Sequence, residues 1–70
     1  MNRNDPAERM WNALKQLARA EKTAISQSEA IKRVKAIARK EGALDLPDHA
    51  LRFYAGEYRE MVSRSLQRLR

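Results

Sequence analysis

The sequence predicts an all-α protein: a small three-helix domain with a long C-terminal helix. The chain of 70 residues has only two Gly and two Pro, and few β-branched residues, so turn and strand signals are scarce. Apolar residues also recur three and four positions apart in three separate segments, which is the spacing of one helical face. We therefore expect one domain over residues 1–70, with helices over about 6–22, 27–41 and 47–69.

The first helix has a clear start. Asp5 is a good N-cap residue, and Pro6 suits the first helical position because its missing N–H has no partner to lose there. The apolar face that follows comprises Ala7, Met10, Trp11, Leu14, Leu17 and Ala18. We expect Trp11, at the edge of this face, to belong to the core.

The second helix has signals at both ends. Ser26 and Glu29 fit a capping box, in which Ser26 caps the helix and Glu29 reaches back to it. Gly42 is placed to end the helix in the left-handed conformation. The apolar arc between them comprises Ala30, Ile31, Val34, Ile37 and Ala38.

The third helix is expected to begin near Pro47, with Asp48 in its first turn. The preceding linker carries Leu44 and Leu46, which we expect to lie under the core. The apolar stripe of the helix comprises Leu51, Tyr54, Ala55, Tyr58, Met61, Val62, Leu66 and Leu69.

Phe53 and Gly56 depart from that stripe and share the opposite face with Glu60 and Ser63. Three interpretations stay open. Phe53 covers the 43–46 linker while Gly56 is incidental; or the helix is wrapped on two sides and Phe53 joins the core; or Phe53, Gly56, Glu60 and Ser63 form a protein interface. The last is attractive because a chain this small buries only about 60% of its unfolded surface, which favours self-association.

The net charge is +6, from 15 Lys and Arg against 9 acids, which favours a polyanionic partner. The strongest candidate surface is the basic side of the second helix, where no acid interrupts residues 30–40, together with the C-terminal arginines. These candidate phosphate-binding residues are Lys32, Arg33, Lys35, Arg39, Lys40, Arg64 and Arg68. The alternative is an ordinary solvated face. Aromatic residues do not alternate with these cations, so the sequence gives little support to base stacking.

The sequence contains no catalytic pattern, and we do not expect an enzyme or a cofactor. There is no Cys and no glycine-rich phosphate loop. His49 is the only His, and although Asp45 and Asp48 lie near it, the adjacent residues 48 and 49 point in different directions on a helix, so we expect no metal site. No segment resembles a secretory signal or a membrane span, so we expect a cytoplasmic protein without a membrane partner.

Two hypotheses of function follow. In the first, the protein is a small DNA-binding regulator that contacts the phosphate backbone and forms a homodimer through the third helix. The connection between the second and third helices is longer than in a helix-turn-helix motif, so backbone contact is favoured over base reading. In the second, it is an adaptor or inhibitor that docks on a larger protein through the face of Phe53 and Gly56.

Overall fold

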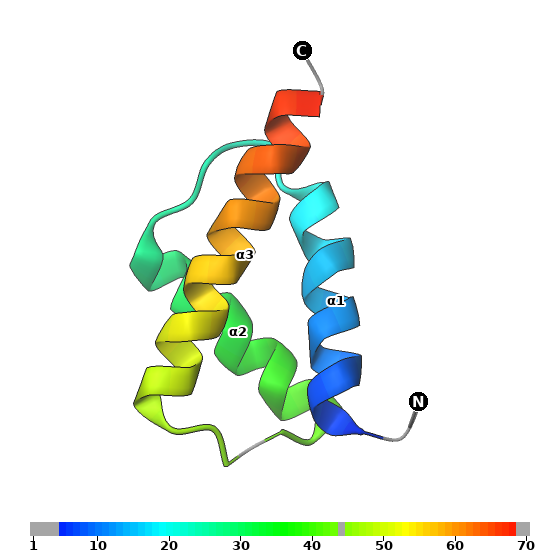
Figure 1. Ribbon diagram of the computed structural model, residues 1–70, viewed down its shortest axis with the longest axis vertical. Coiled ribbons are helices and arrows are strands. Elements are labelled where there is room, and N and C mark those ends of the chain that lie inside the picture. The colour runs from blue at the N-terminus through cyan, green and yellow to red at the C-terminus, as the bar shows by residue number, and fades with distance from the viewer. Residues whose placement is uncertain (1–4, 44, 69–70) are drawn as a thin grey trace.

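The described part of the chain forms three helices: α1 (Pro6–Ala20), α2 (Gln27–Glu41) and α3 (Asp48–Arg68). The computed structural model describes residues 5–43 and 45–68. In Figure 1, α1 and α3 lie side by side and run in the same direction, while α2 crosses behind α3. The expected all-α, three-helix architecture with a long C-terminal helix is confirmed.

The local signals at the helix ends act as expected. The N–H of Ala7 donates to Oδ1 of Asp5 at 3.0 Å, and the N–H of Glu29 donates to Oγ of Ser26 at 3.2 Å. Each bond satisfies one of the free N–H groups of a helix start. Gly42 follows α2 with φ 82°, the left-handed conformation that favours glycine.

Two helix ends differ from expectation. The first helix stops at Ala20, not near Lys22, because Glu21 is extended (φ −69°, ψ 137°) and its side chain is bound by other helices. The third helix begins at Asp48, and Pro47 precedes it: the Pro47 carbonyl accepts a hydrogen bond from the N–H of Leu51 at 3.0 Å. The expected end of the third helix at Leu69 lies outside the described residues.

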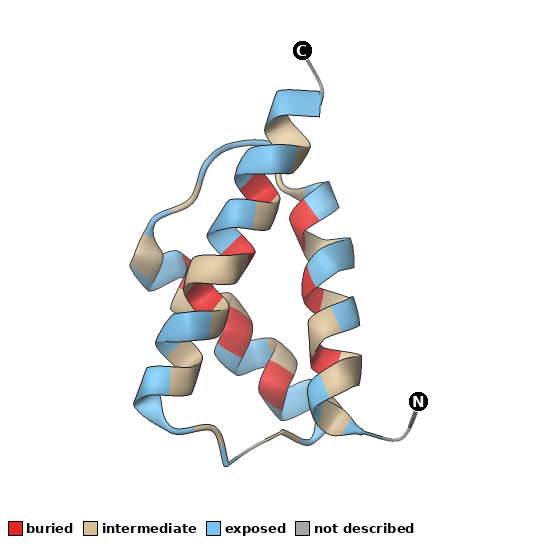
Figure 2. Ribbon diagram, viewed as in Figure 1, coloured by how far each residue is buried: buried red, intermediate tan, exposed pale blue. Residues whose placement is uncertain are grey.

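Three buried residues from each helix form the core, and they face the centre in Figure 2. In α1 and α2 they are spaced by four residues, and in α3 by three and four, so each helix turns one stripe inward. Four of the nine are Ala, which lets helix backbones approach closely. The core residues are Met10, Leu14, Ala18, Ala30, Val34, Ala38, Ala55, Tyr58 and Val62.

Trp11 is not part of this core, and our expectation for it was wrong. Its side chain is half-buried at the edge between α1 and α3, where its ring meets the edge of Tyr54 with centroids 5.9 Å apart. The position follows from the helical spacing, since Met10 and Leu14 occupy the middle of the face and leave Trp11 beside it. In the linker, Leu46 packs against the core as expected, and Leu44 lies outside the described residues.

Candidate nucleic-acid interface

Several basic residues are held by hydrogen bonds within the fold. Arg9 donates from Nε to Oε1 of Glu41 at 3.3 Å and also bonds the Glu41 carbonyl at 3.1 Å, joining the start of α1 to the end of α2. Arg59 donates to the carbonyl of Ile25 at 3.1 Å, so it anchors α3 to the α1–α2 connection. These two arginines serve the packing of the helices.

Arg33 is held in the same way. Its Nε donates to Oε2 of Glu21, and a second guanidinium nitrogen lies 3.0 Å from the carboxylate of Glu29. Glu29 was expected to reach back to Ser26, but its carboxylate instead binds Arg33 and, at 3.7 Å, Lys32. With two carboxylate partners, Arg33 is the candidate residue of α2 with the least charge left for a phosphate.

Tyr58 completes this network from α3. Its side chain is fully buried, and its hydroxyl donates to Oε2 of Glu21 at 2.6 Å. The hydrogen bond from Tyr58 is the largest cause that lowers the pKa of the Glu21 carboxyl, and Arg33 adds to it against the opposing effect of burial. Burial, followed by the Glu21 carboxylate, raises the pKa of the Tyr58 hydroxyl far above its ordinary value. We call Glu21, Arg33 and Tyr58 the Glu21 network.

The remaining candidates on α2 are exposed. Lys35 and Arg39 border a shallow groove floored by apolar residues of α2, the linker and the start of α3. Lys40 is exposed on another side of α2. Among the described residues, Lys35, Arg39 and Lys40 take part in no ion pair. Their charge is therefore available to a partner.

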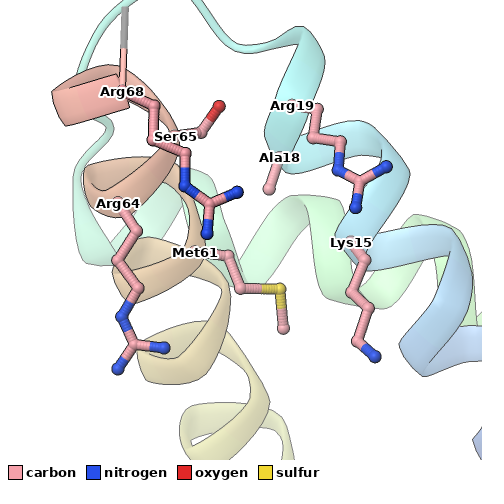
Figure 3. A pocket seen from close by; sticks show the side chains of 7 residues that line it. All are labelled: Lys15, Ala18, Arg19, Met61, Arg64, Ser65 and Arg68. Atoms are coloured by element: carbon pink, nitrogen blue, oxygen red, sulfur yellow. The ribbon is translucent and has the colours of Figure 1, made fainter.

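Arg64 and Arg68 do not join this surface. They lie near the other end of α3, 13 or more residues beyond Leu51, which borders the α2 groove; at 1.5 Å per residue the separation is about 20 Å. The structure instead brings them to Lys15 and Arg19 of α1, as Figure 3 shows. We call Lys15, Arg19, Arg64 and Arg68 the α1–α3 basic groove.

The α1–α3 basic groove is open and shallow, with Met61 and Ala18 between its charged walls. Its volume is about 150 Å³, below the 300–1,000 Å³ typical of small-molecule sites. In Figure 3 the guanidinium of Arg68 reaches over Met61 into the space between the helices. Among the described residues, one acid pairs with the groove: Glu60 lies 3.6 Å from Arg64 in an ion pair in which the Arg64 and Glu60 side chains are 72% and 63% exposed. Such an exposed pair is weak, so it competes little with a phosphate.

The sequence named only the α3 half of this groove. Lys15 and Arg19 stand four residues apart beside the apolar face of α1, which places them on one side of the helix. That spacing was visible in the sequence. Whether Lys15 and Arg19 join other cations depends on which helix lies against α1, and no local sequence pattern gives that information.

The candidate protein interface on α3 is also on the surface. Gly56, Glu60 and Ser63 border a shallow groove with Ala24 and Ile25 of the α1–α2 connection. Phe53 is 60% exposed, so the interpretation that placed it in a wrapped core is wrong. A Cβ added at Gly56 would meet nothing within 4 Å, so no neighbour in the described part of the chain requires glycine there.

The described residues offer little to other classes of site. They contain no group of three or more His, Asp and Glu side chains that could hold a metal ion. None of the helices they form has the length and apolarity to cross a bilayer. Comparison with protein-family models, with curated proteins and with solved structures gave no match.

Proposed function

We propose that this chain is a small, non-catalytic DNA-associated regulator of the cytoplasm that binds the phosphate backbone. The observation that carries the proposal is the α1–α3 basic groove, where four exposed cations from two helices surround one opening; among the described residues only Arg64 has an acid partner, and that ion pair is weak. Arrays of this kind bind nucleic acid by displacing counterions from phosphates.

The exposed cations of α2 supply a second area of contact. Lys35 and Arg39 border Leu51, which lies about 20 Å from the α1–α3 basic groove along α3, close enough for one DNA segment to reach both areas. Arg33 is left out of the proposed contact because the Glu21 network occupies it. Lys32 contributes less than its neighbours because it pairs with Glu29.

The test is a fluorescence anisotropy titration with labelled DNA at several salt concentrations. If about four phosphates are neutralised, log K should fall against log salt with a slope of about −3 to −4. The double variant Arg19→Glu, Arg68→Glu should weaken binding to every sequence and reduce that slope by about 2. Lys35→Glu, Arg39→Glu tests the α2 area in the same way.

The matched control changes the same amount of charge elsewhere. Lys22→Glu, Arg52→Glu alters two exposed residues that border neither basic area. It should reduce affinity less than the groove variant does. Equal losses in the control and groove variants would mean that only net charge matters, and absence of binding at low salt would refute the proposal.

A protein partner is the second candidate function, and the exposure of Phe53 favours it. Phe53 is the one large hydrophobic side chain among the described residues that is mostly exposed. Aromatic side chains are typical anchors at protein interfaces. In this function the face of Phe53, Gly56, Glu60 and Ser63 contacts a second copy of the chain or a larger protein. Light scattering distinguishes a second copy of the chain from a larger protein as the partner. A dimer that Phe53→Asp converts to a monomer would support a homodimer.

A further inference from the structure

Three of the four aromatic residues of the chain gather at one place on the surface. The ring of Tyr54 lies between those of Trp11 and Phe53, with centroids 5.9 Å and 5.6 Å away and edge-to-face angles of 61° and 73°. The contact between α1 and α3 explains why aromatic side chains stand at Trp11 and Tyr54, since both are half-buried there. It does not explain Phe53, which leaves 60% of its surface in water. We call Trp11, Phe53 and Tyr54 the aromatic cluster.

The aromatic cluster continues directly into the α1–α3 basic groove. Because α1 and α3 run side by side in the same direction, successive turns of one helix lie beside successive turns of the other (Figure 1). Lys15 is one turn beyond Trp11 on α1, and Met61 is two turns beyond Tyr54 on α3; both line the groove. The distance along α1 from Trp11 to Arg19 is about 12 Å. Rings and cations therefore follow each other along one seam, although the sequence keeps them apart.

Acidic side chains flank the aromatic cluster on both helices. Glu8 and Glu57, both half-buried, lie one turn from Trp11 and Phe53. They disfavour a phosphate directly over the aromatic cluster. Phosphates are favoured farther along, at Lys15 and at the α1–α3 basic groove. This arrangement favours a ligand whose flat groups rest on the aromatic cluster while its charged backbone points away from Glu8 and Glu57, toward Lys15 and the α1–α3 basic groove.

We propose that this seam binds single-stranded DNA, with bases against the aromatic cluster and phosphates in the α1–α3 basic groove. The inference rests on the proposed function, because it names the form of DNA that the same groove takes. Combining a charged groove with exposed rings is how proteins hold single strands without reading their sequence. In a duplex the bases are stacked inside, so only the cations of the seam would contribute to binding.

The test compares three ligands of equal length: an oligothymidine, an oligomer of the same backbone without bases, and a duplex. Trp11 is the only Trp of the chain, so its fluorescence reports on the aromatic cluster directly. Oligothymidine should bind at least tenfold tighter than the abasic strand and quench Trp11, whereas the duplex should leave the emission unchanged. Phe53→Ala and Phe53→Leu should both weaken oligothymidine binding about five- to a hundredfold without affecting the duplex.

The controls separate this inference from the function on which it rests. Arg19→Glu, Arg68→Glu should weaken binding of all three ligands, and Phe53→Leu keeps an apolar side chain at an exposed position, so the fold should survive. If no DNA binds, both proposals fail. If the abasic strand or the duplex binds as well as oligothymidine, or if Phe53→Leu binds like wild type, stacking is refuted while phosphate binding stands. An oligouridine bound more than tenfold tighter would refute DNA as the ligand.

Discussion

Removing the hydroxyl of Tyr58 tests the Glu21 network. In Tyr58→Phe the carboxylate of Glu21 loses its 2.6 Å hydrogen bond but keeps Arg33, so it is not left without a partner. Hydrogen bonds to charged groups contribute about 1.5–3 kcal/mol, and the retained partner points to the lower end of that range. We expect a loss of about 1.5 kcal/mol at pH 7, which lowers Tm by about 6–12 °C in a domain of this size.

The assay is thermal and urea unfolding followed by circular dichroism at pH 7 and pH 3. The pKa of Glu21 is lowered in the folded protein, so the stability that its ionised form contributes is present above its ordinary pKa of 4.5 and is lost as the pH falls through the folded value. The cost of Tyr58→Phe should therefore shrink toward pH 3. In a Glu21→Gln background the loss of stability caused by Tyr58→Phe should likewise be smaller, because the hydroxyl then meets a neutral acceptor.

Tyr54→Phe is the matched control. It removes the same hydroxyl from a half-buried Tyr of the same helix, and among the described residues that hydroxyl has no hydrogen-bond partner. It should change stability by less than about 0.5 kcal/mol. The reasoning is refuted if the two variants cost the same, or if the cost of Tyr58→Phe is unchanged between pH 7 and pH 3.

Three further predictions concern the fold. Gly42→Ala should destabilise the fold by about 1 kcal/mol because φ is 82°, whereas Gly56→Ala should stabilise it by about 0.5–1 kcal/mol because that position is helical. Neither added Cβ meets an atom within 4 Å, so urea unfolding that shows the two variants changing stability in the same direction would contradict this reasoning. Leu14→Ala should cost about 2–5 kcal/mol by leaving a cavity, against less than 0.5 kcal/mol for the exposed neighbour Lys15→Ala; similar midpoints for the two would contradict this core. Wild-type Tm should fall as the pH drops below 4.5, and Glu21→Gln should flatten that fall; parallel pH curves would exclude Glu21 as its source.

The sequence predicted features that depend on neighbouring residues. Asp5, Ser26 and Gly42 act within a few positions of themselves, and each took its expected role. The inward stripes were also predictable, because any packing of three amphipathic helices buries them. The early end of α1 was not predictable from the sequence, because Glu21 is held by Arg33 and Tyr58, which are 12 and 37 positions away.

The candidate site shows the same division. The sequence identified Arg64 and Arg68 as basic and exposed, but it grouped them with α2. Their true neighbours are Lys15 and Arg19, 45 to 53 positions earlier, and only the parallel placement of α1 and α3 brings the four together. Likewise, Arg33 looked equivalent to Lys35 until the fold supplied it with carboxylate partners. Which cations stay available to a ligand is a property of tertiary structure.

The Glu21 network also bears on how the chain folds. It joins the residue after α1 to the middle of α2 and α3, so no fragment of two helices can form it in full. A contact that needs all three helices forms late, and stabilising it should slow unfolding more than it speeds folding. For a domain with a small core we expect this network to offer kinetic protection, because global unfolding has to break hydrogen bonds that link the end of α1 to α2 and α3.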